Sequence, residues 1–481
     1  MRKLKLLRIP IFAQGIFVPM LIPPILYAAL NGERTMLPAL VFPALIALTL
    51  SVPMLFLIMR GPAQMRGRDG FFLVSLTWIF LSLLGSLPYY WSGAGIRFTD
   101  AVFESVCGFA STGATTISDI EALPRSLLLW RSISHWTGSM GIIVLTVALL
   151  PLLGVGGFQL IKAETPGPEK EKIAPKITQT AKVLWLVYFT FTLILFFLYF
   201  AGGMDCFDAA CNALAILATG GVSTKNEGLR YYNSAYIDVV TTVFMMLGGL
   251  NFNLYFRLLR GKIKDVFYNT EARAYFLIFA AACVIVTVKI FPLYGSAATA
   301  LRYAAFQSAS ILSTTGNVAA NYELWPPLAQ AVLFTLMFIG GCSGSTACGV
   351  KVIRYTVLFK QAVNELRRMI YPRGVFTVQL NSKIGRKDVV YGVAGFIFLY
   401  FFIVIVTTLF TAASGVSLFT SFSAALSILG NVGIGFGGVG PMQNYGFFSD
   451  SVKWLFCFVM IAGRLELWTV FVLFSPEFWR N

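Results

Sequence analysis

Four short segments decide the fold of this chain: FASTGATT (residues 109–116), LATGGVST (217–224), LSTTGNVA (312–319) and LGNVGIGFG (429–437). Each segment lies between two long apolar stretches. Alignment of the four segments matches one glycine in each, namely Gly113, Gly220, Gly316 and Gly433. The glycines are 107, 96 and 117 residues apart, so the chain contains four copies of one unit. Each unit is predicted to be a membrane helix, a short half-helix, a glycine turn and a second membrane helix.

The composition indicates an integral membrane protein. Hydrophobic residues make up 57% of the chain and charged residues only 12%, whereas soluble domains carry about 25% charged residues. The basic start MRKLKLLRIP is followed by an apolar run without a small-residue cleavage site. We therefore expect this run to be retained as the first membrane helix.

Apolar runs of roughly 20 residues are long enough to cross a bilayer. The sequence predicts ten such spans, near residues 13–30, 36–59, 71–90, 128–152, 183–202, 234–256, 273–292, 327–350, 389–412 and 452–475. Four apolar segments are too short to cross, near 98–111, 206–219, 301–314 and 419–430. Such re-entrant segments are tolerated only around a protein-lined or water-filled path.

The expected fold is therefore all-α and membrane-embedded, with four helix–half-helix–helix repeats around one central pore and two extra N-terminal helices. The predicted units are residues 1–67 (N-terminal extension), 68–165, 166–265, 266–375 and 376–481 (pore repeats one to four).

The distribution of basic residues predicts the orientation of the chain. With the N-terminus inside, the cytoplasmic segments hold 27 Lys and Arg residues and the external segments hold six. Cytoplasmic loops of membrane proteins carry this excess, so both termini are expected in the cytoplasm. The same distribution excludes a nucleic-acid partner as the reason for the net charge of +16. Acidic residues, Glu104 among them, are expected on the outer face, where they attract cations.

The aligned glycines have a specific chemical use. A chain that reverses after a half-helix needs positive φ angles, which glycine adopts without steric cost. Rings of backbone carbonyls bind dehydrated cations in selective pores. The alternative is that these glycines only allow close helix packing, but four at matching places favour the pore.

The repeats resemble the TrkH family of bacterial potassium-uptake subunits, which is grouped with the KtrB and plant HKT proteins. The resemblance is carried by the turns and by RDGF (68–71), FTDAVFESVCGFASTGATT (98–116), GSMGIIVLTVALLPLLGVGGFQL (138–160), AETPGPEK (163–170), GGCSGSTACGVKVIR (340–354) and GRLELWTVFVLFSPEFWR (463–480). It implies that the chain conducts K⁺ inward through a carbonyl-lined filter in the bacterial inner membrane.

We expect the filter to comprise Ser111, Thr112 and Gly113, then Ala218, Thr219 and Gly220, then Thr314, Thr315 and Gly316, and finally Asn431, Val432 and Gly433. The K⁺ ligands would be the backbone carbonyls of Thr112, Gly113, Thr219, Gly220, Thr315, Gly316, Val432 and Gly433. In this interpretation K⁺ is the transported ion, and no organic cofactor is expected.

The stretch GGCSGSTACG (340–349) predicts a gate. Its glycines, serines and threonine form a poor continuous helix, and in the family an interrupted helix obstructs the path at the matching place. The predicted gate residues are Gly340, Gly341, Cys342, Ser343, Gly344, Ser345, Thr346 and Arg464. The alternative for the loop is a glycine kink that serves packing.

Arg464 lies deep within the last predicted span, where a charge costs at least about 2.5–3.5 kcal/mol on insertion scales. It should therefore face the pore side, the alternative being an ion pair with Glu466. The resemblance implies that it contacts the gate loop, because TrkH proteins have an arginine at the matching position. Lys453 is expected to extend towards the outer surface. His135, the only histidine, is expected to be packed and hydrogen-bonded.

Two other functional classes were weighed against a channel. A secondary carrier that couples a solute to Na⁺ or H⁺ commonly has two inverted repeats, unlike four units in one direction. An enzyme would need paired carboxylates or metal ligands at one face, and the spans offer only Asp238 and Glu466, in different units. The resemblance further implies a homodimer and a cytoplasmic TrkA-type nucleotide-binding ring, while anionic lipids are alternative partners for the basic face.

Overall fold

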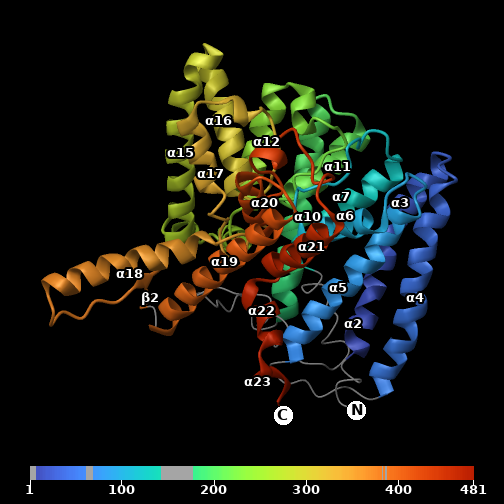
Figure 1. Cartoon of the computed structure of the whole chain (residues 1–481), viewed down its shortest axis with the longest axis horizontal. Helices are drawn as coiled ribbons and strands as arrows, with labels where there is room; N and C mark the ends of the chain where they lie inside the picture. The colour runs from blue at the N-terminus through green and yellow to red at the C-terminus, as the bar shows by residue number, and fades with distance from the viewer. Residues whose placement is uncertain (1–6, 61–68, 142–176, 382, 385–386, 481) are drawn as a thin grey trace.

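The computed structural model describes residues 7–60, 69–141, 177–381, 383–384 and 387–480. Nearly every regular element in these residues is a helix (Figure 1). The strands there are the two-residue elements β1 (Gln379–Leu380) and β2 (Lys383–Ile384), which pair antiparallel. The all-helical membrane class predicted from the sequence is thus confirmed.

The N-terminal extension is a helical hairpin. Its first arm consists of α2 (Arg8–Ala13), the 3₁₀ turn η1 (Gln14–Ile16) and α3 (Phe17–Leu30), and its second arm is α4 (Met36–Arg60). Both arms are long and apolar enough to cross a membrane. The hairpin packs against the first repeat through contacts of α3 with α7 and of α4 with α5.

Each repeat begins with a long helix and continues with a short one. The long helices are α5 (Asp69–Tyr90), α10 (Ile177–Ala201), α15 (Thr270–Tyr294) and α19 (Lys387–Ala413). The short helices are α6 (Phe98–Ala110), α11 (Cys206–Leu217), α16 (Ala297–Leu312) and α20 (Leu418–Gly430). At 1.5 Å per residue the short helices cannot cover a bilayer core of about 30 Å, as the half-helix prediction requires.

The second helices of the four repeats differ from one another. In repeat one, α7 (Arg125–Ser139) covers the start of the predicted span 128–152, whose remainder lies outside the described residues. In repeat three, α17 (Pro327–Leu336) ends early and α18 (Val352–Ile370) begins after a non-helical loop. The interruption expected at 340–349 is therefore present.

The predicted continuous spans 234–256 and 452–475 are wrong. The first is two helices, α12 (Ala235–Gly248) and α13 (Phe252–Leu259), bent by 92°. The second is α21 (Asp450–Arg464) followed by α22 (Leu467–Phe471) and η6 (Val472–Phe474), bent by 114°. The first break follows two glycines and ends where the Asn251 side chain caps α13. The second break lies at Glu466, a non-glycine residue with φ of 59°.

The remaining elements are short or surface-exposed. They are η3 (Gly228–Tyr232), α14 (Ile263–Phe267), η4 (Tyr322–Leu324), η5 (Gly437–Val439) and α23 (Pro476–Trp479). By length and composition, six described helices can cross a membrane, and up to eight spans result if each bent pair counts as one.

The repeats pack into a closed arrangement. Each half-helix packs against the long helix before it, as in the pairs α5–α6 and α15–α16. Neighbouring repeats meet through α7 and α11, through α12 and α16, and through α21 and α6, so the fourth repeat returns to the first. Helix α18 projects away from this body at the lower left of the view (Figure 1).

Candidate ion pathway

All four half-helices end in the same backbone structure. The residue after, or one past, each helix has a left-handed conformation with φ between 51° and 56°: Ser111, Thr219, Thr314 and Asn431. The next residue donates its N–H to the carbonyl five positions earlier at 2.8–2.9 Å, in the pairs Thr112–Cys107, Gly220–Ala215, Thr315–Ser310 and Val432–Ser427. This is the bond of a Schellman cap. The shared cap fixes which residues of the four repeats are equivalent.

The cap corrects the predicted alignment in repeat two. The glycine two residues after the left-handed residue is Gly113 in repeat one, Gly316 in repeat three and Gly433 in repeat four. In repeat two it is Gly221, not Gly220. The triplet equivalent to Ser111, Thr112 and Gly113 is therefore Thr219, Gly220 and Gly221, while Ala218 keeps a right-handed helical conformation. Two adjacent glycines in ATGG allowed either alignment in the sequence, and only the backbone angles separate them.

The four turns meet at one axis. A Cβ atom added to Gly113 would lie 3.2 Å from the carbonyl oxygens of Gly220 and Val432 and 3.3 Å from that of Thr315. These three carbonyls occupy one equivalent position in the other three repeats. An added Cβ would likewise meet the Thr315 carbonyl at Gly221, the Val432 carbonyl at Gly316 and the Gly113 backbone at Gly433. Backbone atoms alone therefore fill the space around the axis.

Side chains join neighbouring turns behind this backbone ring. Asn431 donates Nδ2 to Thr112 Oγ1 at 2.7 Å, which links repeats four and one. Asn317 donates Nδ2 to the Gly221 carbonyl at 3.3 Å, which links repeats three and two. The Tyr322 hydroxyl donates to the carbonyl of Gly435 in repeat four at 2.5 Å. The predicted filter side chains are buried in the protein around the backbone ring and are not exposed at its surface.

Two charges that were expected at the outer surface are buried instead. Glu104 has 1% of its surface exposed and pairs with Arg131. Lys453 is fully buried and pairs with Asp100 at 2.6 Å, while it also donates to the Gly446 carbonyl at 2.9 Å. Both pairs are formed because a charge inside the protein needs a partner to offset its desolvation.

Exposed acidic groups remain around the outer ends of the turns. Asp119 accepts a hydrogen bond from the Asn226 side chain at 2.9 Å. This bond, with support from the backbone N–H of Ala122, holds the pKa of Asp119 below its usual range. The side chain therefore stays ionised at neutral pH.

The loop of repeat three lies directly behind the turns. Cys348 donates its backbone N–H to Thr314 Oγ1 at 3.0 Å, and Thr314 is the left-handed residue of a turn. Cys342 and Thr346 donate backbone N–H groups to the carbonyls of Gly249 and Gly248 at 2.8 and 3.3 Å. These carbonyls are free to accept because the helix breaks between α12 and α13. The break in repeat two therefore holds the loop of repeat three in place.

A buried acid holds the start of the loop. Glu271 Oε1 accepts the backbone N–H of Ser343 at 2.6 Å and that of Ile353 at 3.2 Å. The predicted gate residues Gly340 to Thr346 thus form one segment that is bonded on several sides.

Arg464 contacts this loop as predicted. It donates to the Thr346 carbonyl at 2.8 Å and to Cys348 Sγ at 3.0 Å. Its other amino group donates to the carbonyls of Gly138, at 3.0 Å, and Ser139 at the end of α7. The guanidinium therefore bridges the loop of repeat three and the inner helix of repeat one.

The alternative partner of Arg464 is excluded. Glu466 pairs with Arg354 of α18, whose guanidinium lies 3.6 Å from the ring centre of Phe396.

Comparison with known proteins agrees with this geometry. The family model TrkH, described as a cation transport protein, matches residues 41–481. The chain belongs to the TrkH family. The Trk system potassium uptake protein TrkH of Salmonella typhimurium is 38% identical over 427 residues, which cover 88% of each chain. TrkI of Halomonas elongata is 35% identical and covers 92% of this chain and 91% of its own.

A solved structure is similar over the whole chain. The crystal structure of the potassium transporter TrkH from Vibrio parahaemolyticus matches with a TM-score of 0.89 and 33% identity, and the match covers 100% of both chains. The TrkH family assignment made from the turn segments is confirmed.

Several residues of this TrkH-family site were missed in the sequence. Gly248 and Gly249 carry the carbonyls that hold the loop, and the pair GG followed by Asn251 within an apolar run was an available signal for a helix break. Cys348 and Glu271 gave no such signal, because their partners are more than 30 residues away in the chain.

His135 differs from the expectation. It is fully buried against Gly220, but neither ring nitrogen has a hydrogen-bond partner among the described residues.

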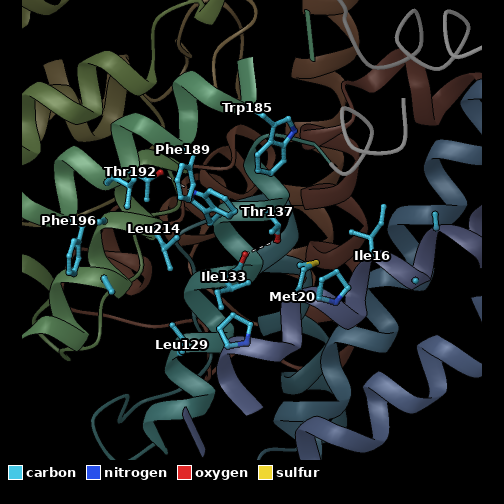
Figure 2. A pocket seen from close by; sticks show the side chains of 18 of the residues that line it. Ile16, Met20, Leu129, Ile133, Thr137, Trp185, Phe189, Thr192, Phe196 and Leu214 are labelled. Atoms are coloured by element: carbon cyan, nitrogen blue, oxygen red, sulfur yellow. Dashed lines mark hydrogen bonds between the residues drawn. The ribbon is translucent and has the colours of Figure 1, made fainter. Parts of the chain in front are cut away.

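A large cavity lies away from the candidate ion pathway. It has a volume of about 920 Å³ and lies among the N-terminal hairpin, α7, α10 and α11 (Figure 2). The described side chains that line it include Met20, Ile133, Trp185 and Phe196 and none that is charged. An apolar space of this kind offers no ligands to a cation, so the ring of turns remains the candidate pathway.

Proposed function

We propose that this chain is a potassium-uptake channel subunit that conducts K⁺, and Rb⁺, inward through the ring of four turns. The observation that carries the proposal is the convergence of three equivalent carbonyls, those of Gly220, Thr315 and Val432, on Gly113 of repeat one. Carbonyl rings of this kind replace the hydration shell of K⁺. The printed names of the relatives, which are potassium uptake proteins and a potassium transporter, support the same ion.

The corrected alignment changes the proposed ligands in repeat two. The two carbonyl layers would come from Thr112 and Gly113, Gly220 and Gly221, Thr315 and Gly316, and Val432 and Gly433. Thr219 would contribute one position further inward, next to Ser111, Thr314 and Asn431. The membrane potential would drive entry with about 2.3 kcal/mol per charge per 100 mV.

The loop and Arg464 are proposed as the gate below these layers. A fixed guanidinium beside a narrow path repels a cation strongly where the dielectric constant is low. The bonds of Arg464 to the Thr346 carbonyl and to Cys348 hold charge and loop together. Conduction would therefore require both to move.

The setting of the protein is proposed from the sequence. The 27 basic residues of the predicted inner segments favour cytoplasmic termini in the bacterial inner membrane. The proposed assembly is a homodimer with one pore in each subunit, regulated by a cytoplasmic TrkA-type nucleotide-binding ring, with anionic lipids on the basic face.

The test is radioactive Rb⁺ uptake into liposomes that contain only this protein, with K⁺ or Na⁺ as competitor. Competition by K⁺ at concentrations where Na⁺ has no effect supports the proposal. A carrier is the second candidate, because the 92° and 114° bends resemble the broken helices of carriers. Uptake that stops when a Na⁺ or H⁺ gradient is removed, with the membrane potential clamped, would favour the carrier and contradict a channel.

A further inference from the structure

The carboxylate of Glu104 lies next to the turn of repeat one and bonds to the irregular segment that follows this turn. Its side chain is completely buried in α6. Oε1 accepts the Thr115 hydroxyl at 2.7 Å, the Thr116 backbone N–H at 2.7 Å and the Thr116 hydroxyl at 3.3 Å. Thr115 and Thr116 lie two and three residues after Gly113, so this carboxylate holds the segment that follows the repeat-one turn.

Arg131 extends the same contact to repeat two. Its Nε donates to Glu104 Oε2 at 3.2 Å, and its side chain is 3% exposed. Its terminal nitrogen donates to the Ser223 carbonyl at 3.5 Å. Ser223 lies two residues after Gly221. One ion pair therefore connects the segments that follow the turns of repeats one and two.

The equivalent position differs in the other repeats. It lies seven residues before the left-handed residue and is occupied by Glu104, Asn212, Gln307 and Ala424 in repeats one to four. Gln307 donates to the Ala320 carbonyl at 2.8 Å, and Asn212 donates to the Asp208 carbonyl at 2.9 Å. A neutral amide is thus sufficient to hold the segment after the turn in repeat three. Asn212 bonds only within its own helix, and in repeat two Asp208 accepts the Thr224 hydroxyl instead, at 2.8 Å. Ala424 offers no polar side chain in repeat four.

The charge in repeat one therefore needs a reason beyond packing. A buried ion pair is costly to desolvate and is often no more stabilising than an apolar replacement. It is directional, however, and it restrains the groups that it bonds. Selectivity among cations depends on the number and arrangement of the carbonyls around the ion, and these two turns supply half of them.

We infer that the Glu104–Arg131 pair is a selectivity-determining positioning element. It fixes the spacing between the segments that follow the turns of repeats one and two, so that their carbonyls do not rearrange to fit the smaller Na⁺. The inference rests on the proposed function, because it assumes that the ring of turns is the K⁺ filter. Neither side chain touches the ion.

The test is Glu104→Gln in the full chain in liposomes, with Rb⁺ uptake measured at increasing Na⁺ or K⁺. The substitution keeps the shape of the side chain and gives repeat one the residue type of Gln307. The ratio of the Na⁺ to the K⁺ inhibition constant should fall about fivefold, which corresponds to about 1 kcal/mol, the difference between a charge-assisted and a neutral hydrogen bond. Rb⁺ uptake without competitor should stay within about twofold of wild type, since the carbonyls remain.

Two further variants separate positioning from surface charge and from misfolding. Thr115→Val removes the hydroxyl that donates to Glu104 without leaving a charge unpaired, and it should lower the same ratio in the same direction. Glu227→Gln removes one negative charge from an exposed pair with Arg230, and it should leave the ratio unchanged. If Glu104→Gln does not fold, Thr115→Val decides the question.

The outcomes distinguish this inference from the proposed function. Wild-type protein that does not prefer K⁺ over Na⁺ contradicts the proposed function itself. Wild-type protein that prefers K⁺, together with unchanged ratios in Glu104→Gln and Thr115→Val, overturns only the positioning role. A ratio that falls equally in Glu227→Gln also overturns it, because surface charge would then be sufficient.

Discussion

The outer and inner halves of the four repeats differ in how closely they repeat. In the outer half, every half-helix ends in a left-handed residue with φ between 51° and 56°, and the same backbone bond follows. In the inner half, repeat two bends by 92° after Gly248, repeat three has no helix between Leu336 and Val352, and repeat four bends by 114° at Glu466. The outer half is nearly symmetric and the inner half is not.

Under the proposed function, this difference separates recognition of an ion from obstruction of its path. A cation is bound by ligands on all sides, so every repeat must supply the same carbonyls. A path can be closed by one segment from one side, so the inner helices were free to diverge. Substitutions in the outer half should therefore reduce uptake, whereas substitutions in the inner half should increase it.

The largest effect is expected in the symmetric half, from Gly316→Ser. Gly316 has φ of 74°, and an added Cβ would meet the Val432 carbonyl. A side chain in this conformation is strained by about 1–3 kcal/mol, and the contact in addition displaces a carbonyl that is proposed to bind K⁺. Rb⁺ uptake in liposomes should fall at least about tenfold.

The matched control is Gly295→Ser. Gly295 has φ of 64° with no atom within 4 Å of the added Cβ, so it carries the strain without the contact. Equal uptake in both variants would show that the meeting of the turns has no role in conduction.

The next effect has the opposite sign and comes from the inner half. Arg464→Ala removes the charge bonded to the Thr346 carbonyl, and deletion of residues 344–346 removes that carbonyl. Each change should raise basal Rb⁺ uptake about fivefold, and their combination should add little, because both remove parts of one obstruction.

Arg368→Ala serves as the control for Arg464→Ala, since Arg368 forms an exposed pair with Glu365 on α18. If Arg464→Ala and the deletion fold but conduct no more than wild type, loop and arginine are not the gate.

A smaller effect tests the corrected alignment in repeat two. A Cβ at Gly220 would meet the His135 ring, whereas a Cβ at Gly221 would meet the Thr315 carbonyl. The loss caused by Gly220→Ala should therefore be recovered by His135→Ala, while the loss caused by Gly221→Ala should not. We expect a difference of about threefold in Rb⁺ uptake between the two double variants. If His135→Ala restores Rb⁺ uptake in both double variants, the corrected alignment is wrong and Gly220 is the residue equivalent to Gly113.

The smallest effect comes from one hydrogen bond between repeats. Thr112→Val removes the acceptor of Asn431 Nδ2, which keeps a second bond to the Met460 carbonyl at 3.2 Å. A single neutral hydrogen bond contributes about 0.5–1.5 kcal/mol, and we expect uptake to fall about twofold. Thr335→Val, whose hydroxyl bonds within its own exposed helix, should behave as wild type. An unchanged Thr112→Val would mean that the turn of repeat one does not depend on repeat four.

The half-helices and the loop of repeat three could be predicted from the sequence because each depends on the composition of a short, continuous stretch. The half-helices are short apolar runs, and the loop of repeat three is a stretch too rich in glycine for a helix. The bends at Gly249 and Glu466 were missed because apolar composition continues across them. The alignment at Gly220 failed because adjacent glycines are equivalent until their φ angles are known.

The buried ion pairs were beyond prediction for a different reason. Lys453 and Asp100 are 353 residues apart, and each alone resembles a surface charge near the end of a span. Only the return of repeat four to repeat one brings them together. A charged residue within an apolar stretch therefore indicates that it has an ion-pair partner, but the sequence does not indicate which residue that partner is.

Helix α18 makes the loop mechanically accessible from a distance. It begins at Val352, directly after Lys351, whose Nζ donates to the Ala347 carbonyl within the loop at 2.7 Å. Its 19 residues form a rod about 28 Å long that projects from the body of the molecule (Figure 1). Near its start, Arg354 pairs with Glu466, so the helix also connects the loop to the fourth repeat. If the loop is the gate, as proposed, a displacement of α18 would be transmitted to it through Lys351.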